Sequence, residues 1–258
     1  MSLLLRNELR LSIGPRRCEA SIWRAGLPAR HLGSAEGPGY GEESIEQLLD
    51  ALQADGHALP AQATACIADE YLYYVVLPAS GAWGGADQAA RRYFADAIGS
   101  DDLLVETSLT PCGRQWIAVA VEPGRVALLR DSLAQRDIAL RHVRPALLQD
   151  LDAMRADLRI EDAVLIVLRS EGASFVDLQA GSISCIVWER IDLADPELLM
   201  ARVAGHQFRR QPASTAQAPA PEVAVIVVPG DDAQQERMRP LAAAKGWRLT
   251  APLQAPSR

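Results

Sequence analysis

Hydrophobic and polar positions in the second half of the chain follow strand and helix periods in a clear order. Residues 163–168 form a continuous apolar run, which is typical of a strand buried on both faces. The patterns at 173–178 and 182–189 predict two further strands, each preceded by a short turn. A helix is predicted from Pro196 to about residue 210, because Asp195 is a good cap and proline suits the first helical position.

The rest of this half contains two strands and one more helix. A strand at 222–228 precedes a helix that begins at Asp231 or Asp232 and ends at Lys245, with Gly246 behind it. A short strand follows at 247–250, and the proline-, alanine- and glutamine-rich segment 211–221 is predicted as a flexible loop. The resulting element order is β-β-β-α-β-α-β.

The first half begins with a similar pattern. Strands are predicted at 8–13 and 17–24, and the sequence Gly14-Pro15 marks the turn that joins them. The segment 33–41 ends in GPGYG and is predicted as a loop, because it lacks the spacing of a nucleotide-binding glycine motif. An amphipathic helix at 42–54 and a strand at 63–68 follow. No third strand is evident before residue 33, although a short one can fit there.

The middle of the chain, at about 71–143, departs from this pattern. Its elements are a strand at 71–77, a helix at 86–98, strands at 103–109 and 115–121, a helix at 123–135 and a strand at 138–143. The order β-α-β-β-α-β is that of a ferredoxin-like domain. An amphipathic helix that opens at Pro145 and reaches Leu158 then bridges to the second half. We therefore expect an α/β protein with domains at 1–158 and 159–258.

Composition excludes several classes of partner and compartment. The 258 residues are 49% hydrophobic and 23% charged, which is ordinary for globular domains, and the net charge of −7 argues against binding to nucleic acid. No segment approaches the roughly 20 apolar residues of a membrane span, and the start of the chain does not read as a signal peptide. We therefore expect an intracellular protein whose four cysteines are reduced core thiols.

The residues give no catalytic or metal-binding constellation. The chain contains no P-loop, no G-x-S-x-G elbow and no H-E-x-x-H motif, and its four histidines lack metal-ligand spacing. The acidic pairs at 69–70, 101–102 and 231–232 are not convincing acid/base pairs, because neighbouring residues on a strand face opposite ways and Asp232 suits a helix cap. We therefore predict no catalytic residue, no metal and no cofactor.

The element order of the second half is that of the ribonuclease-H-like fold, the repeating unit of actin-type proteins. Two such lobes with a ferredoxin-like insertion in the first resemble the actin-like cytoplasmic platform proteins of bacterial envelope machines. These are the PilM-type proteins of type IV pili, the cytoplasmic part of the type II secretion L component, and the cell-division protein FtsA. The resemblance covers nearly the whole chain. It includes two short local sequences, one at 118–121 before a helix and one at 140–145 before the bridging helix.

The resemblance implies that the nucleotide positions of this family are degenerate here. ATP-binding members carry an Asp-x-Gly turn in the first hairpin, where this chain has Ser12 and Gly14, and Glu19 stands where a phosphate-facing lysine is expected. The second acidic turn reads Leu168-Arg-Ser-Glu-Gly172, with Leu168 or Arg169 in place of aspartate, and Pro229-Gly230 replaces the glycine pair on the adenine side. A glutamate or arginine at these places disfavours phosphate and Mg²⁺ binding respectively.

These features favour a non-catalytic scaffold, a pseudo-ATPase peripheral to a bacterial inner membrane. Such a scaffold would bind the cytoplasmic segment of a single-pass membrane protein, and it could also bind another copy of itself. Candidate anchors for a partner are Tyr71, Tyr73 and Trp83, because aromatic side chains on a strand or a loop tip are typical of interfaces. Burial of these rings in the core is at least as common. The alternative function is a divergent ATPase or small-molecule kinase of the same superfold.

Overall fold

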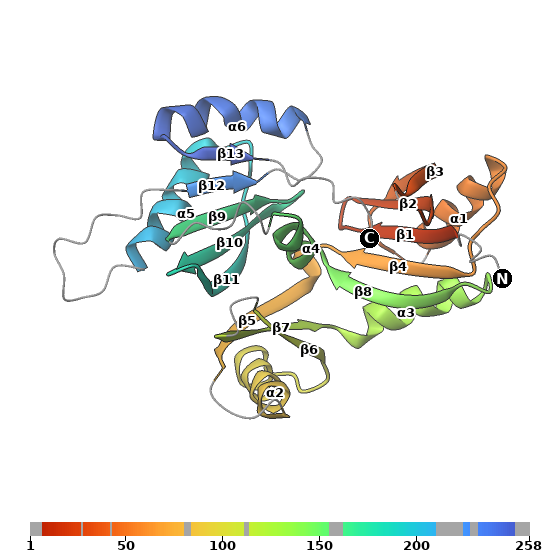
Figure 1. The fold of residues 1–258 in the computed structure, drawn as a ribbon, viewed down its shortest axis with the longest axis horizontal. Helices are drawn as coiled ribbons and strands as arrows, with labels where there is room; N and C mark the ends of the chain where they lie inside the picture. Colours follow the sequence, from red (N-terminus) through yellow and green to blue (C-terminus); the bar gives the residue numbers. More distant parts are fainter. Residues whose placement is uncertain are drawn as a thin grey trace. The chain divides into compact units, whose positions relative to one another are not determined.

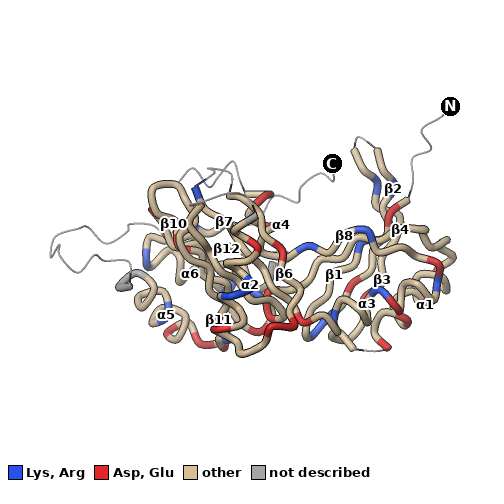
Figure 2. Tube along the Cα trace, turned by 90° about the horizontal axis from the view of Figure 1, so that it is seen from below, with Lys and Arg blue, Asp and Glu red and all other residues tan. Residues whose placement is uncertain are grey.

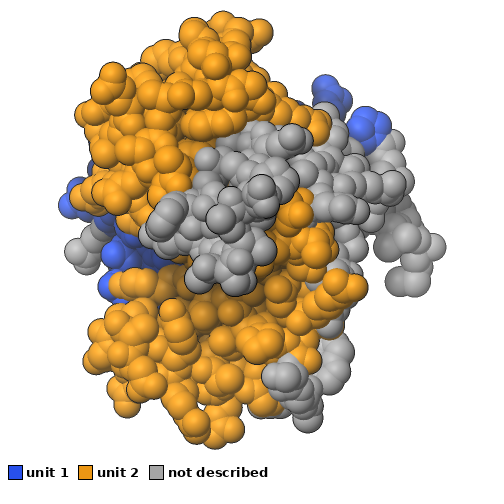
Figure 3. Space-filling view, turned by 90° about the vertical axis from the view of Figure 1, so that its left-hand side faces the viewer, with its two compact units in different colours: residues 1–72, 121–149, 254–258 blue, residues 73–120, 150–253 orange. Residues whose placement is uncertain are grey.

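The structure, a computed structural model, describes residues 7–26, 28–41, 43–79, 84–110, 114–154, 162–209, 224–227 and 232–250. Contacts divide the chain into two compact units, coloured separately in Figure 3. Unit 1 comprises residues 1–72, 121–149 and 254–258, and unit 2 comprises residues 73–120 and 150–253. Each unit contains one five-stranded mixed sheet, and unit 2 also contains most of a three-stranded sheet (Figure 1).

The sheet of unit 1 has β1 at its centre. Its strand order is β3 (Arg30–Pro38), β2 (Arg17–Arg24), β1 (Asn7–Ile13), β4 (Gln62–Ile67) and β8 (Ala139–Pro145). The first three strands form an antiparallel meander, whereas β4 runs parallel to both β1 and β8. Helices α1 (Ser44–Ala54) and α3 (Pro123–Ala134) both lie on one side of this sheet (Figure 2).

Alternation along β1 explains why the helices cover only that side. Leu9, Leu11 and Ile13 are buried, whereas the residues between them are polar and at least partly exposed. The helices contribute the matching apolar surface from Ile45, Leu48, Leu49 and Leu52 of α1 and from Val126, Leu129 and Leu133 of α3. The core of unit 1 therefore lies between one face of the sheet and these two helices.

The five-stranded sheet of unit 2 repeats the same strand order. It consists of β11 (Ser182–Arg190), β10 (Gly172–Gln179), β9 (Ala163–Leu168), β12 (Ala224–Val227) and β13 (Arg248–Thr250). Its helices are α5 (Pro196–Arg209) and α6 (Asp232–Lys245), which pack Leu199 and Met238 against a core that contains Phe175 and Ile226. The strand and helix order predicted for this half is confirmed.

The predicted helix ends of unit 2 are also confirmed. The Asp195 carboxylate accepts hydrogen bonds from the backbone N–H groups of Glu197 and Leu198, at 3.0 and 3.2 Å, and so caps α5. Behind α6, Gly246 has a φ of +66°, a left-handed conformation that glycine adopts without strain. The predicted loop at 211–221 lies outside the described residues.

The small sheet has the order β5 (Leu72–Pro78), β7 (Gln115–Val121), β6 (Leu104–Leu109). Helix α2 (Gly84–Ile98) covers one of its faces and packs Ala90 and Phe94 against Val75 and Ala118. Two short elements complete the description, the 3₁₀ turn η1 (Asp69–Tyr71) before β5 and helix α4 (Ala146–Ala153) after β8. The bridging helix predicted as far as Leu158 is described only up to α4 and Met154.

The predicted ferredoxin-like insertion at 71–143 is wrong in its last two elements. The separate sheet contains only β5, β6 and β7, because β8 pairs in parallel with β4 in the sheet of unit 1. Helix α3 belongs with β8, since Leu129 and Leu133 are buried in unit 1. The insertion contributes a β-α-β-β segment, and the helix and strand that follow it belong to the lobe. Together they have the β-α-β-β-α-β order of a ferredoxin-like domain, so the order of elements alone could not show where the insertion ends.

The predicted loop at 33–41 is also wrong, because β3 runs through most of it. Its glycines allow close packing rather than flexibility: a Cβ on Gly33 would lie 2.1 Å from Nε2 of His57, and one on Gly37 would lie 3.3 Å from Leu48. Pro38 ends the strand at the edge of the sheet, where a missing N–H costs little. Unit 1 therefore has the same β-β-β-α-β-α-β order as unit 2, interrupted by the small sheet and its helix.

Candidate functional site

The two hairpins β1–β2 and β9–β10 carry most of the positions at which the resemblance implies residues for nucleotide binding. In the first, Ser12 and Glu19 lie opposite each other on neighbouring strands, on the face away from the helices. Ser12 is exposed, and the Glu19 carboxylate lies 3.7 Å from the guanidinium of Arg17. A hydroxyl and a carboxylate with a flanking arginine therefore stand where the resemblance implies an aspartate and a lysine.

The turn of this first hairpin is held by the chain itself. The carbonyl of Gly14 accepts a hydrogen bond from the backbone N–H of Tyr40 at 2.9 Å and a weaker one from the Cys18 thiol at 3.7 Å. A Cβ on Gly39 would lie 1.8 Å from the carbonyl oxygen of Pro15, so only glycine fits there. Burial raises the pKa of the Cys18 thiol, which therefore stays protonated at neutral pH.

A close contact within the hairpin explains why position 14 is a glycine. A Cβ at this position would lie 2.9 Å from the carbonyl oxygen of Arg17, which is closer than side chains approach backbone atoms. The tightness of the hairpin therefore accounts for this glycine without any ligand.

In the second hairpin, the resemblance implies an aspartate at the place of Leu168 or Arg169; Leu168 ends β9, and Arg169 lies in the short turn that follows. The backbone N–H of Arg169 donates to the carbonyl of Gly172 at 2.8 Å, which closes the turn. The Arg169 guanidinium lies 2.8 Å from the Asp150 carboxylate of α4, and only 10% and 16% of these side chains are exposed. Arg169 thus carries a largely shielded positive charge that is already paired, which does not suit the Mg²⁺-binding role that the resemblance implies for an aspartate.

Gly172 is likewise explained by packing. A Cβ on this residue would lie 2.1 Å from the carbonyl oxygen of Glu189 in the neighbouring strand β11. The remaining nucleotide position, Gly230, lies outside the described residues.

The buried acids of the described residues have structural partners. Asp69 is fully buried, and its carboxylate accepts a hydrogen bond from the backbone N–H of Leu147 at 3.0 Å, in the first turn of α4. Among the residues that the structure describes, no group of three or more histidine, cysteine, aspartate and glutamate side chains could hold a metal ion. The acidic pair Asp69-Glu70 therefore contributes a helix cap.

A buried histidine that the sequence analysis did not single out lies in unit 2. The ring of His206 in α5 stacks on Phe175 with centroids 4.3 Å apart and planes 11° apart. Its Nε2 lies 3.2 Å from Glu189, and its Nδ1 lies 4.0 Å from Asp177, which is also buried. The Glu189 carboxylate also lies 3.4 Å from Nε of Arg202. The spacing of these residues on three elements gives no local motif, so only the fold could bring them together.

The candidate anchors for a partner do not form one cluster. Tyr71 ends η1 in unit 1, where the Arg125 guanidinium lies 4.1 Å from the centre of its ring and Tyr40 makes an edge contact at 6.2 Å. Tyr73 lies in β5 in unit 2 and is 39% exposed. Trp83 lies outside the described residues. Tyr71 is therefore engaged within its own unit, whereas Tyr73 is accessible.

Tyr40 strengthens the cluster around Tyr71. Its hydroxyl donates a hydrogen bond to the carbonyl of Arg125 at 2.7 Å, and burial raises its pKa to about 12, although the nearby Arg125 charge opposes this shift. Because the backbone N–H of Tyr40 also binds Gly14, this cluster fixes the first hairpin turn to α3 and η1.

Accessible apolar side chains concentrate in the segment that contains the small sheet. Among the described residues, the large hydrophobic side chains classed as exposed are Tyr73, Tyr93, Ile98 and Leu104. All four come from β5, α2 and β6. Of these four residues, only Tyr73 was predicted from the sequence as an anchor, because an amphipathic pattern does not show which apolar residues remain uncovered after folding. No described helix is long and apolar enough to cross a membrane.

Comparison with known proteins adds the identity of the fold. No family model and no curated protein matches the sequence. Among solved structures, the chain is similar to one described as the PilM–PilN type IV pilus biogenesis complex. The two sequences are 16% identical, the alignment covers 95% of this chain and 87% of that chain, and the TM-score is 0.66. It is also similar to a Bacteroides thetaiotaomicron protein with an actin-like ATPase fold and unknown function, with 10% identity, 97% and 93% coverage and a TM-score of 0.60.

A third similar structure is the cytoplasmic domain of EpsL, an inner membrane component of the type II secretion system of Vibrio cholerae. It is 12% identical, the alignment covers 88% of this chain and 84% of that chain, and the TM-score is 0.53. The resemblance stated from the sequence is thus confirmed at the level of structure, at low sequence identity. The chain has the actin-like ATPase fold, built from two mixed sheets and a small antiparallel sheet.

Proposed function

We propose that this protein is a non-catalytic scaffold on the cytoplasmic side of a bacterial inner membrane, in an assembly of the type IV pilus or type II secretion kind. The observation that carries the non-catalytic part is the shielded ion pair between Arg169 and Asp150. An ATPase of this fold needs a carboxylate free to hold Mg²⁺ or water in this turn, and a guanidinium cannot serve that purpose. Ser12 and Glu19 in the other hairpin support the same proposal.

The partner that we propose is an extended cytoplasmic segment of a single-pass inner-membrane protein. The structural similarity to PilM, solved in complex with PilN, and to the EpsL cytoplasmic domain motivates this choice. The docking region that we favour is the small sheet, because the exposed large hydrophobic side chains of the described residues all lie in or beside it. The outer strands β5 and β6 also offer free backbone groups to an added strand.

Site-specific photo-crosslinking in cells tests the partner and its site together. A benzophenone amino acid at position 73 is expected to capture one membrane protein, because Tyr73 is exposed on an outer strand of the small sheet. The matched control is position 47, an exposed glutamine on α1 in unit 1, away from the small sheet. Recovery of a single-pass inner-membrane protein from position 73 and not from position 47 supports the proposal.

A deletion gives the second arm of the test. The segment to remove is 73–120, replaced by a flexible linker, because a deletion of 71–143 would also remove α3 and β8 from the sheet of unit 1. A folded deletion variant that still co-purifies with the same membrane protein would place the docking site elsewhere. Loss of binding by a deletion variant that still unfolds cooperatively on heating would support the small sheet.

A further inference from the structure

One face of the unit 1 sheet is not covered by α1 or α3. Both helices pack on the opposite face, where Leu9, Leu11 and Ile13 are buried. We call the uncovered side the open face; it carries Arg10, Glu19, Trp23, Glu36, Thr64 and Arg144 at alternating strand positions. Among the residues that the structure describes, the β1 side chains on this face retain access to solvent, so a partner can reach them.

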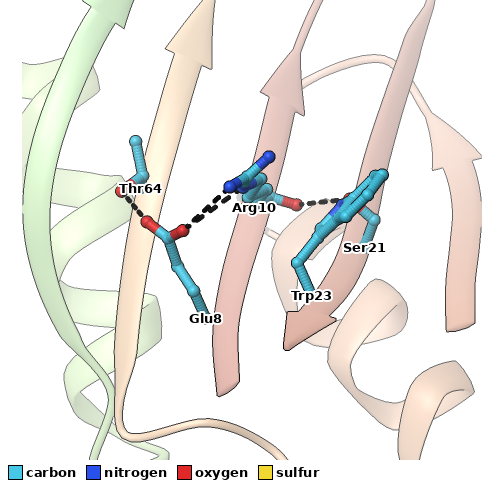
Figure 4. A network of polar contacts seen from close by, with 5 residues as sticks. All are labelled: Glu8, Arg10, Ser21, Trp23 and Thr64. Atoms are coloured by element: carbon cyan, nitrogen blue, oxygen red, sulfur yellow. Dashed lines mark hydrogen bonds and ion pairs between the residues drawn. The ribbon is translucent and has the colours of Figure 1, made fainter. Parts of the chain in front are cut away.

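The centre of the open face is ordered before any partner binds (Figure 4). Thr64 donates a hydrogen bond to Glu8 at 2.6 Å, and Arg10 contacts the other oxygen of Glu8 at 3.2 Å. The Arg10 guanidinium also lies 5.0 Å from the ring centre of Trp23, whose Nε1 donates to Ser21 at 3.0 Å. Side chains fixed in this way lose little conformational entropy when a partner covers them.

Charge on the open face is distributed asymmetrically about β1. At the β8 edge, Arg144 makes no ion pair with another described residue. At the opposite side, Glu19 and Glu36 share the single guanidinium of Arg17. The β8 edge is therefore positive, and the side formed by β2 and β3 has excess negative charge.

The register puts these charges at equal distances from the central strand. Pairing runs across the sheet in one row from Arg144 through Cys66, Ser12 and Glu19 to Glu36. Ser12 lies on β1, and two strand spacings separate it from each end of the row, about 10 Å on either side. A two-fold rotation about an axis parallel to β1 and above the open face would therefore place Arg144 of one molecule opposite Glu36 of another.

We propose that the open face is the interface of a symmetric homodimer, with its two-fold axis parallel to β1. A two-fold interface uses the same patch twice and must be complementary to itself, and the row of charges has this property. A partner of uniform charge would meet repulsion at one end of the row. This inference concerns unit 1 and does not depend on the membrane-protein partner. The ion pairs between Arg144 of one molecule and Glu36 of the other would lie at the accessible ends of the row. The association is therefore expected to weaken as salt concentration rises.

Analytical ultracentrifugation of the full chain with three variants tests the dimer. Wild type is expected to dimerise with rising concentration, whereas Arg144→Glu and Glu36→Arg should each shift the dissociation constant upward at least tenfold through repulsion at both ends of the row. The control is Arg91→Glu, which makes the same change in charge at an exposed position on α2 and should leave the dimer unchanged. Thermal unfolding of each variant establishes that it is folded.

Mixing the two interface variants gives the decisive result. In a heterodimer of Arg144→Glu with Glu36→Arg, both ends of the row again have opposite charges, so mixing is expected to restore association. A wild type that stays monomeric at several hundred micromolar would overturn the proposal. The same conclusion would follow if Arg144→Glu dimerised as well as the Arg91→Glu control, or if mixing restored nothing.

Discussion

The two five-stranded sheets have the same strand order but use their faces differently. In unit 2 every residue of the central strand β9 is buried, so the sheet is shielded on both faces. In unit 1 the central strand β1 alternates between buried leucine or isoleucine and polar side chains that retain access to solvent. One topology thus supports a closed unit and a unit with an open face, and only the alternation of the central strand distinguishes them.

The same contrast separates the two hairpins. The turn of unit 2 contains an ion pair that is largely shielded from water, between Arg169 and Asp150. In unit 1, Arg17 and Glu19 pair on the surface with 60% and 40% of their side chains exposed. Charge–charge contacts therefore contribute to the packing of unit 2, whereas in unit 1 they remain available to a partner.

The largest expected effect distinguishes the two central strands. Leu165→Ala removes a side chain of β9 that is 1% exposed, on the face away from α5 and α6, and is expected to cost about 3 kcal/mol of unfolding free energy. Arg10→Ala, at a polar position of β1, is expected to cost less than about 1 kcal/mol. Urea denaturation of both variants measures the difference. Equal costs would mean that the face of β9 away from the helices is not part of a packed core.

A second comparison concerns glycines that lie against backbone atoms. Gly172→Ala and Gly39→Ala would each place a Cβ within about 2 Å of a carbonyl oxygen, so we expect each to lose about 2 kcal/mol of stability. Gly205→Ala is the control, because a Cβ there meets nothing within 4 Å and α5 should gain stability from alanine. Thermal melting provides the test, and stability retained in Gly172→Ala would contradict the close approach of β10 and β11.

The ion pairs of the two hairpins give the third comparison. Arg169→Gln leaves the Asp150 carboxylate partly buried without its partner and is expected to cost about 2 kcal/mol. Arg17→Gln removes an exposed contact and is expected to cost less than about 1 kcal/mol. The double variant Arg169→Gln with Asp150→Asn should recover part of the loss in urea titrations. A full loss in the double variant would show that the guanidinium acts through packing alone.

The smallest effect at neutral pH concerns Tyr40. Because burial raises the pKa of Tyr40 in the folded state to about 12 from its ordinary value of 10.0, the neutral phenol contributes stability that is fully present below pH 10. That contribution should be lost as pH rises from 10 to 12, and Tyr40→Phe should remove the pH dependence in this window. The protein contains five tyrosines, so the difference in absorbance at 295 nm between wild type and Tyr40→Phe in the folded state follows the ionisation of this hydroxyl. A titration midpoint near 10 would contradict the burial of this hydroxyl.

Local patterns in the sequence predicted most of the elements. Alternation of Leu9, Leu11 and Ile13 predicted β1, the apolar run at 163–168 predicted β9, and Asp195 and Gly246 marked helix ends correctly. These features depend on neighbours within one or two turns of chain, which is why sequence alone reveals them.

Features that depend on distant partners could not be predicted. The membership of β8 in the unit 1 sheet rests on parallel pairing with β4, more than 70 residues earlier, and no local pattern records such a pairing. The same holds for Arg169 with Asp150 and for His206 with Glu189. At the candidate site, the resemblance predicted which residues stand at phosphate and metal positions, a prediction that stays open, whereas only the structure showed that Arg169 pairs with the largely buried Asp150.

We expect this protein not to bind ATP, and isothermal titration of ATP with Mg²⁺ measures that binding directly. No saturable binding is expected up to millimolar ATP, which corresponds to a binding free energy weaker than about −4 kcal/mol. Arg169→Asp, which restores an acidic turn, is the comparison variant, and Glu19→Lys tests the first hairpin in the same way. A dissociation constant in the low micromolar range for wild type, about −8 kcal/mol, would contradict the account and favour an active nucleotide site.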